Sequence, residues 1–175
     1  MKHKPFRVII LLMGLAFFFS CGNSSSPGDF SVNSPQGWTR EDTLSDDGSK
    51  RAEFTAPFDE GYSGFIENIS VSIIHTSISI ARYSKALVNE VKELTVFYEE
   101  KGKGDELING TKMKWIQMQV LFKSSKNDEK KEQKIYFAKG KGNIYMIVCT
   151  AKKDGIALMQ NEIREVVNSF RIIND

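Results

Sequence analysis

Apolar and polar residues alternate along residues 68–76, and this pattern predicts a β-strand. Ile69 and Val71 would share one face of the strand, because successive side chains of a strand point to opposite faces. Shorter patterns of the same kind predict strands over 30–32 and 51–56, bounded by turns that contain proline or glycine. The first part of the domain is therefore expected to be β-structure.

After these strands, the spacing of apolar residues changes to three and four. The apolar positions are Ile80, Tyr83, Leu87, Val91, Leu94 and Tyr98. This spacing predicts an amphipathic helix of about 20 residues. Ser79 is suited to be its N-cap, and we expect Gly102 and Gly104 to end it.

The second half of the chain returns to strand patterns. Asn109-Gly110 is a strong hairpin signal, and it precedes a segment whose two faces both carry apolar residues. Ile116, Met118, Val120 and Phe122 would lie on one face, and Met113, Trp115 and Leu121 on the other. A charged loop over 123–134 and two further strands, over 135–138 and 144–151, are expected to follow.

A second amphipathic helix is predicted near the C-terminus. Asp154 is expected to cap it, and its apolar positions are Ile156, Met159, Ile163 and Val167, which indicates about 14 residues. The hairpins imply an antiparallel sheet. We therefore predict an α+β fold in which a sheet of about six strands is flanked by one long helix and one C-terminal helix.

Residues 1–20 have the pattern of a removable export signal. Three basic residues come first, and an unbroken apolar run of 12 residues follows over 8–19. A transmembrane helix needs about 20 apolar residues, so this run is short for a span and has the length of a signal core. A buried core helix fits poorly, because a Ser/Gly/Pro-rich segment follows at 22–28. We predict a signal peptide over 1–20, a flexible tether over 21–28 and a single domain over 29–175.

The charge balance changes once the signal is set aside. The chain has 24 Lys and Arg residues against 22 Asp and Glu residues. Three of the basic residues and none of the acidic residues lie in the signal, so the mature chain has 21 against 22, a net charge of −1. A basic nucleic-acid-binding surface is therefore not predicted.

Few residues of the mature chain are suited to chemistry. His75 is its single histidine; a hydrogen-bonded side chain at the edge of the core is the main interpretation, and ligand binding or pH sensing is the alternative. Cys149 lies in an apolar run, as is typical of a buried cysteine that acts as a small hydrophobic residue. No zinc-type spacing and no nucleophile motif occurs. We therefore predict no catalytic residues, no metal site and no cofactor.

The sequence Lys-Gly-Lys-Gly occurs twice, at 101–104 and at 139–142. Neither copy has the spacing of a P-loop. We interpret both as solubilising turns, with contact to phosphate or to anionic lipid headgroups as the alternative.

Cys21 resembles the modified cysteine of bacterial lipoproteins. Ser20 is small, as the cleavage site of that family requires, whereas Phe18 stands where the family usually has leucine. In that family the cysteine thiol receives a diacylglycerol, the chain is cut just before the cysteine, and the new N-terminus is often acylated, typically with palmitate. The resemblance implies that Cys21 is the lipidation site and that acyl chains hold the protein on a membrane without spanning it. An ordinary signal with an unmodified Cys21 is the alternative.

Five short motifs follow one another along the mature chain. They are Phe30-Ser31-Val32, Pro35-x-Gly37-Trp38, Asn68-Ile69-Ser70-Val71, Asn109-Gly110 and Ser169-Phe170-Arg171. In this order they resemble the PsbP-like superfamily, which includes bacterial lipoproteins related to DcrB. The resemblance implies a central antiparallel sheet flanked by helices and a non-enzymatic, accessory function. The metal-binding residues of its photosynthetic members match no positions here.

These patterns favour a membrane-anchored lipoprotein of the cell envelope that acts as a non-enzymatic binding or accessory module. It would lie on the outer side of the inner membrane or on the outer membrane, with an envelope protein as its partner and no nucleic acid. The alternative is a carrier of a small ligand, with a pocket between the sheet and the long helix. A hydrolase that uses carboxylates alone is a third class, for which no pair of acidic residues stands out.

Overall fold

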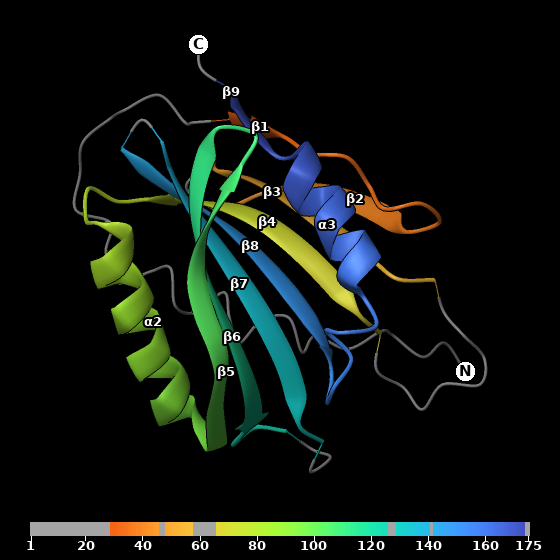
Figure 1. Ribbon diagram of the computed structural model, residues 1–175, viewed down its shortest axis with the longest axis vertical. Coiled ribbons are helices and arrows are strands. Elements are labelled where there is room, and N and C mark those ends of the chain that lie inside the picture. Colours follow the sequence, from red (N-terminus) through yellow and green to blue (C-terminus); the bar gives the residue numbers. More distant parts are fainter. Residues whose placement is uncertain (1–28, 46–47, 58–65, 126–128, 141, 174–175) are drawn as a thin grey trace.

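A seven-stranded antiparallel sheet, with strand order β2-β3-β4-β8-β7-β6-β5, organises the chain (Figure 1). The structure, a computed structural model, describes residues 29–45, 48–57, 66–125, 129–140 and 142–173. The predicted signal peptide and tether, and with them Cys21, lie outside the described residues.

The described elements alternate between hairpin-connected strands and two helices. In chain order they are β1 (Asp29–Ser31), β2 (Thr39–Leu44), β3 (Lys50–Thr55), β4 (Asn68–His75), α2 (Ile80–Leu94), β5 (Thr95–Ile108), β6 (Thr111–Phe122), β7 (Lys131–Gly140), β8 (Asn143–Lys152), α3 (Gln160–Ser169) and β9 (Arg171–Ile173). This architecture confirms the predicted α+β fold class. None of the helices in the described part of the chain combines the length and the apolar character of a membrane span.

Both faces of the sheet are apolar, and each face is covered by different elements (Figure 1). On one face, Tyr83, Leu87 and Val91 of α2 pack against residues of β6, β7 and β8. On the other face, Ile163, Val166 and Val167 of α3 pack against β3, β4 and β8 together with β1. Strand β6 contributes Ile116 to the first cluster and Met113 to the second, which confirms the predicted strand with two buried faces.

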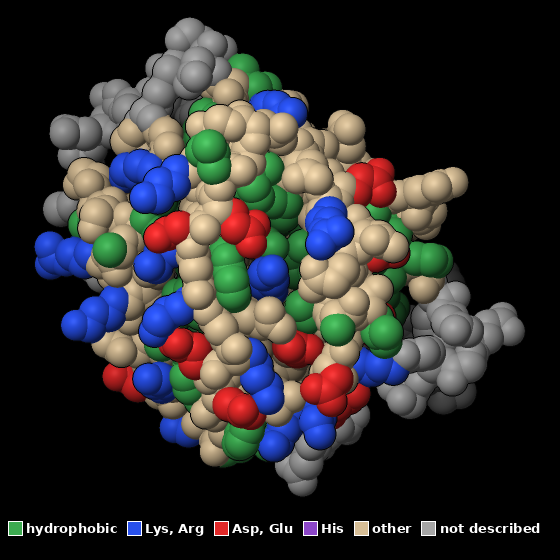
Figure 2. All heavy atoms as spheres, in the orientation of Figure 1, with side chains coloured by type: hydrophobic (Ala, Val, Ile, Leu, Met, Phe, Trp, Pro, Cys, Tyr) green, Lys and Arg blue, Asp and Glu red, His purple; other side chains and the backbone are tan. Residues whose placement is uncertain are grey.

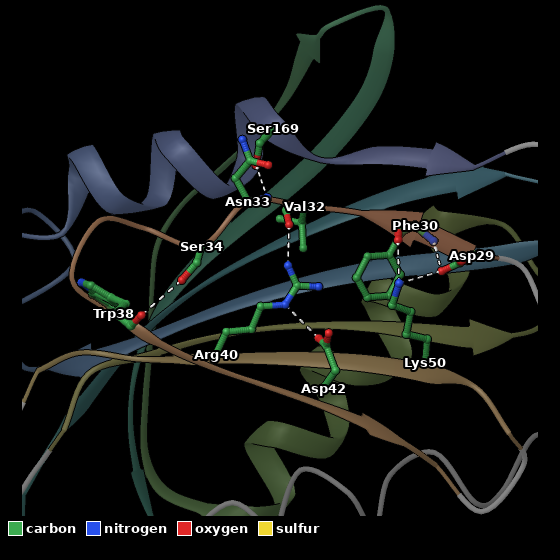
Figure 3. A network of polar contacts seen from close by, with 10 residues as sticks. All are labelled: Asp29, Phe30, Val32, Asn33, Ser34, Trp38, Arg40, Asp42, Lys50 and Ser169. Atoms are coloured by element: carbon green, nitrogen blue, oxygen red, sulfur yellow. Dashed lines mark hydrogen bonds and ion pairs between the residues drawn. The ribbon is translucent and has the colours of Figure 1, made fainter.

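Strands β1 and β9 form a separate antiparallel pair that joins the two ends of the described chain. Figure 3 shows how polar contacts hold β1 over the main sheet. The ammonium of Lys50 lies 3.1 Å from an Asp29 carboxylate oxygen and donates to the carbonyl oxygen of Phe30 at 3.1 Å. Nη1 of Arg40 donates to the carbonyl oxygen of Val32 at 2.8 Å. Residues from Asp29 onward are therefore held to the rest of the domain by strand pairing and polar contacts.

The long helix is shorter than predicted, because it ends at Leu94 and β5 begins at the next residue. The N-cap is confirmed, since the side chain of Ser79 accepts a hydrogen bond from the backbone N–H of Arg82. The error arose because Tyr98 continues the helical spacing of apolar residues by coincidence. Residues 95–98 are Thr-Val-Phe-Tyr, which are β-branched or aromatic and favour strands.

Three other boundaries also differ from expectation. Strand β2 was not predicted, because all six of its residues are exposed and it shows no apolar alternation. Strand β7 begins at Lys131, inside the segment predicted as a charged loop. Helix α3 has 10 residues and begins at Gln160; Asp154 lies in the preceding turn with a positive φ of 63° and is not its cap.

The hairpin signal at Asn109-Gly110 is confirmed. Both residues have positive φ angles, 52° and 79°, as a type I′ turn requires, and they join β5 to β6. The side-chain amide of Asn109 also donates to the carbonyl oxygen of Asn168 near the end of α3. This hydrogen bond attaches the tip of the β5–β6 hairpin to the C-terminal end of α3.

We expect Phe170→Ala to destabilise the fold by about 3–5 kcal/mol, the usual cost of truncating a buried phenylalanine. Its ring packs against Phe30 and Tyr145, with centroid distances of 6.1 and 5.8 Å, so it joins β1, β8 and the end of α3. Urea unfolding would measure the change. Leu158→Ala is the control, because Leu158 is 77% exposed and should cost at most about 0.5 kcal/mol; equal losses in the two variants would contradict the assigned core.

Candidate functional site

His75 lies at the end of β4 and both nitrogens of its ring make hydrogen bonds. Nδ1 lies 2.8 Å from Oδ1 of Asn143, and Nε2 lies 2.9 Å from Oγ of Ser49. Because an amide oxygen only accepts, Nδ1 donates to Oδ1 of Asn143, and Nε2 shares a hydrogen bond with the Ser49 hydroxyl. The predicted interpretation of His75 as a hydrogen-bonded residue at the edge of the core is confirmed.

The order of these three groups resembles a nucleophile, base and amide relay, but its burial favours a structural role. Ser49 and Asn143 are each 1% exposed, so a substrate carbonyl has no access to the hydroxyl of Ser49. The trio connects the start of β3, the end of β4 and the start of β8. Its effect is to fix the end of the sheet at which the β2–β3 and β7–β8 hairpins meet.

Cys149 is a buried free thiol on β8, as predicted. Burial raises the pKa of its thiol to about 12, although the positive charge of Lys134 opposes the shift. The thiolate is the reactive form of cysteine, so Cys149 is unreactive in the folded protein near neutral pH.

The two Lys-Gly-Lys-Gly segments have different structures. Residues 101–104 are not a turn, since they lie within β5, where Gly102 and Gly104 face the ring of Trp115. The second segment begins at the end of β7. There Nζ of Lys139 donates to the backbone carbonyl oxygens of residues 76 and 78, at 2.7 and 3.1 Å, and so ties this hairpin to the start of α2.

A group of side chains on the α3 face of the sheet, which we name the Lys134 cluster, was missed by the sequence analysis. It consists of Trp115 and Gln117 of β6 and Glu132, Lys134 and Tyr136 of β7. Nζ of Lys134 lies 4.7 Å from the ring centroid of Trp115 and 5.0 Å from that of Tyr136. Lys134 is only 9% exposed. Figure 2 shows this face of the molecule, where hydrophobic, basic and acidic side chains gather between β5 and α3.

Glu132 ties the Lys134 cluster to the segment that leads into α3. One of its carboxylate oxygens accepts a hydrogen bond from Nε2 of Gln117 at 2.7 Å, and the other accepts from the backbone N–H of Ile156 at 3.2 Å. Glu132 is 6% exposed. The cluster therefore has a fixed position relative to α3.

A weak signal for this cluster was present in the sequence. Glu132, Lys134, Tyr136 and Ala138 alternate with the apolar residues Ile135 and Phe137, which extends the strand pattern back into the charged segment. The alternation was not recognised because residues 123–134 are rich in charged side chains, as exposed loops commonly are.

Two charged side chains lie near the aromatic end of the cluster. Burial raises the pKa of the Tyr136 hydroxyl above its ordinary value; Glu106 on β5 adds to this rise and Arg164 on α3 opposes it. Tyr136 is therefore neutral at physiological pH. The cluster offers one fixed cation and two aromatic faces, and its amide and carboxylate, Gln117 and Glu132, are hydrogen-bonded to each other, which suits recognition of a polar or anionic group by the cation.

The predicted ligand pocket between the sheet and the long helix stays a prediction. At that interface α2 packs its buried side chains on Ile116, Met118, Ile135 and Phe137, and the ring of Tyr83 meets that of Phe137 edge-on with centroids 6.2 Å apart. Among the residues that the structure describes, no group of three or more His, Cys, Asp or Glu side chains is arranged to hold a metal ion.

Comparison with known proteins gives structural likeness only. No protein-family model matches the chain, and no curated protein matches it. Cyanobacterial PsbP (CyanoP) from Synechocystis sp. PCC 6803 is similar with a TM-score of 0.53 and 15% identity, covering 89% of this chain and 99% of that protein. PA94 from Pseudomonas aeruginosa, a protein of unknown function, is similar with a TM-score of 0.58 and 8% identity, covering 86% and 99%.

LpqN of Mycobacterium tuberculosis, a protein involved in cell envelope biogenesis, is also similar. Its TM-score is 0.54 at 16% identity, and the match covers 86% of this chain and 88% of LpqN. At such identities the likeness shows the fold alone. The predicted PsbP-like fold is thus confirmed.

We expect His75→Ala to lower the free energy of unfolding by about 2 kcal/mol, because it removes a hydrogen-bond partner from two buried polar groups. Chemical denaturation would measure the loss. Ser77→Ala nearby is the control, since Ser77 is exposed and its truncation should be close to neutral. A His75 variant as stable as the parent would contradict the structural role.

Proposed function

We propose that this protein is a lipid-anchored cell-envelope protein that acts as a non-enzymatic binding module and presents the α3 face of its sheet to a partner. The observation that carries this proposal is the Lys134 cluster. Its polar groups converge on one patch and are held by neighbouring strands, as is typical of preformed binding sites. The position of the cluster relative to α3 is fixed through Glu132.

The state of the candidate catalytic groups supports binding in preference to catalysis. The imidazole of His75 is engaged on both sides, and the hydroxyl beside it is buried. The thiol of Cys149 is buried and has a raised pKa. The residue types best suited to nucleophilic or general-base chemistry therefore serve the packing of the domain.

The position of β1 supports a domain held close to a membrane. The proposed tether, residues 21–28, has eight residues, and an extended chain spans at most about 3.3–3.6 Å per residue, or about 26–29 Å in total. Asp29 follows directly and is paired with Lys50 and with β9. The likeness of the fold to LpqN, which is involved in cell envelope biogenesis, agrees with this location.

We expect Cys21→Ser to release the protein from the membrane fraction of the producing cells. The wild-type protein should pellet with membranes and carry acyl chains on Cys21, because two or more acyl chains hold a protein stably on a bilayer. Fractionation and intact mass measurement would test this. Cys149→Ser is the matched control and should stay in the membrane fraction; a wild-type protein with an unmodified Cys21 would remove the anchor from the proposal.

Site-specific photocrosslinking in intact cells would test the binding face. A photoreactive residue at position 117, on the α3 face beside Lys134, should give a discrete crosslinked product. The same residue at position 85, on the exposed side of α2, should give none or a different product. Lys134→Gln should reduce the product at position 117. Equal products from the two faces, or products that Lys134→Gln leaves unchanged, would argue against this face as the binding surface.

A further inference from the structure

Lys134 is unusual because its side chain is largely buried while its ammonium pairs with no carboxylate of the described residues. Only 9% of the residue is exposed, and among the described residues its ammonium contacts the rings of Trp115 and Tyr136 but forms no ion pair. A buried charge is normally paired with an opposite charge and fully hydrogen-bonded. The aromatic faces attract the ammonium, but they leave its hydrogen-bond donors free.

Glu132, the acidic residue nearest along the strand, forms no ion pair with Lys134, and its oxygens are held by neutral donors. Both carboxylate oxygens of Glu132 are engaged, one by Gln117 and the other by the backbone N–H of Ile156. Gln119 lies on the same face of the sheet and is 2% exposed, and its Nε2 has no acceptor. Two hydrogen-bond donors on this part of the face, the ammonium of Lys134 and the side-chain amide of Gln119, therefore have no acceptor among the described residues.

The aromatic support under the ammonium is rigid. A side chain at Gly102 or Gly104 of β5 would come within 3.0–3.3 Å of the indole of Trp115, so the ring lies flat against these two glycines. Trp115 in turn fixes the place of the ammonium. A cation held in position in this way needs no rearrangement before it pairs with a ligand.

We propose that the Lys134 cluster is a binding site for one oxyanion, a carboxylate or phosphate group, with the ammonium of Lys134 as its counter-charge. This inference rests on the proposed function and names the chemistry that the binding face recognises. A cationic ligand is disfavoured because both oxygens of the only carboxylate in the cluster, Glu132, already accept hydrogen bonds, whereas the ammonium of Lys134 pairs with no carboxylate of the described residues. The oxyanion can be free or can belong to a lipid headgroup, and the two sources are distinguishable by experiment.

The fluorescence of Trp115 is the direct readout. The full-length protein in nonionic detergent, carrying Trp38→Phe so that Trp115 is the single tryptophan, is titrated with inorganic phosphate and with acetate against sodium chloride at matched ionic strength. In the second arm the detergent is removed and the protein is reconstituted into vesicles of phosphatidylglycerol or of phosphatidylcholine. We expect a saturable change with at least one oxyanion and none with chloride. A response to phosphatidylglycerol vesicles without a response to free anions would identify the headgroup as the source.

Matched variants make the test specific. Lys134→Gln should weaken the response about tenfold or more, as expected for the loss of a charge-assisted hydrogen bond, and Lys134→Arg should retain it. Lys112→Gln, an exposed position of the neighbouring strand β6 on the opposite face of the sheet, should change it less than about twofold. Thermal melts verify that each variant is folded.

The proposal is overturned if no oxyanion gives a saturable signal, or if Lys134→Gln responds like the parent. Position-specific crosslinking at residue 117 together with such a negative result would leave the binding module standing and remove the anion site. Loss of crosslinking together with an intact anion response would leave the anion site standing and remove the α3 face as the surface that binds a protein partner.

Discussion

The burial of one sheet on both of its faces is the constraint from which the rest of the architecture follows. The central strands carry apolar side chains on each side, so that Ile147 of β8 faces α3 while Val148 faces α2. Covering both faces is favourable because roughly 25 cal/mol is gained for each Å² of apolar surface removed from water. One helix covers each face, and β1 and β9 extend the cover beside α3. Each helix is therefore needed for its own face of the sheet, and neither can replace the other.

The same constraint explains where polar residues are tolerated in the sheet. Helix α3 packs over β3, β4 and β8, and the part of the same face that lies on β6 and β7 contains Gln117, Glu132 and Lys134. Gln117 and Glu132 are hydrogen-bonded to each other, whereas Lys134 pairs with no carboxylate of the described residues. The patch thus marks the boundary between the core and a surface that is free to interact.

Strands with strong apolar alternation could be predicted from the sequence, and strands without it could not. Strand β4 and both faces of β6 could be predicted, because Ile69, Val71 and Ile116 report directly on burial. Strand β2 could not, since an edge strand with every side chain in water has no apolar signal. Strand β5 was hidden by Tyr98, whose spacing fits a helix. Helix length, strand ends and the Lys134 cluster all depend on contacts between segments far apart in the chain, which local periodicity does not contain.

The pairing of β1 with β9 has a mechanical meaning if the domain is pulled from its N-terminal side. Force applied at Asp29 enters through a pair of strands only three residues long, reinforced by the ion pair with Lys50 and by hydrogen bonds from Lys50 and Arg40 to backbone carbonyl oxygens. The long ladders of β6, β7 and β8 carry load only after this short pair has yielded. Under tension, β1 would therefore detach first, while the seven-stranded sheet and both helices keep their structure.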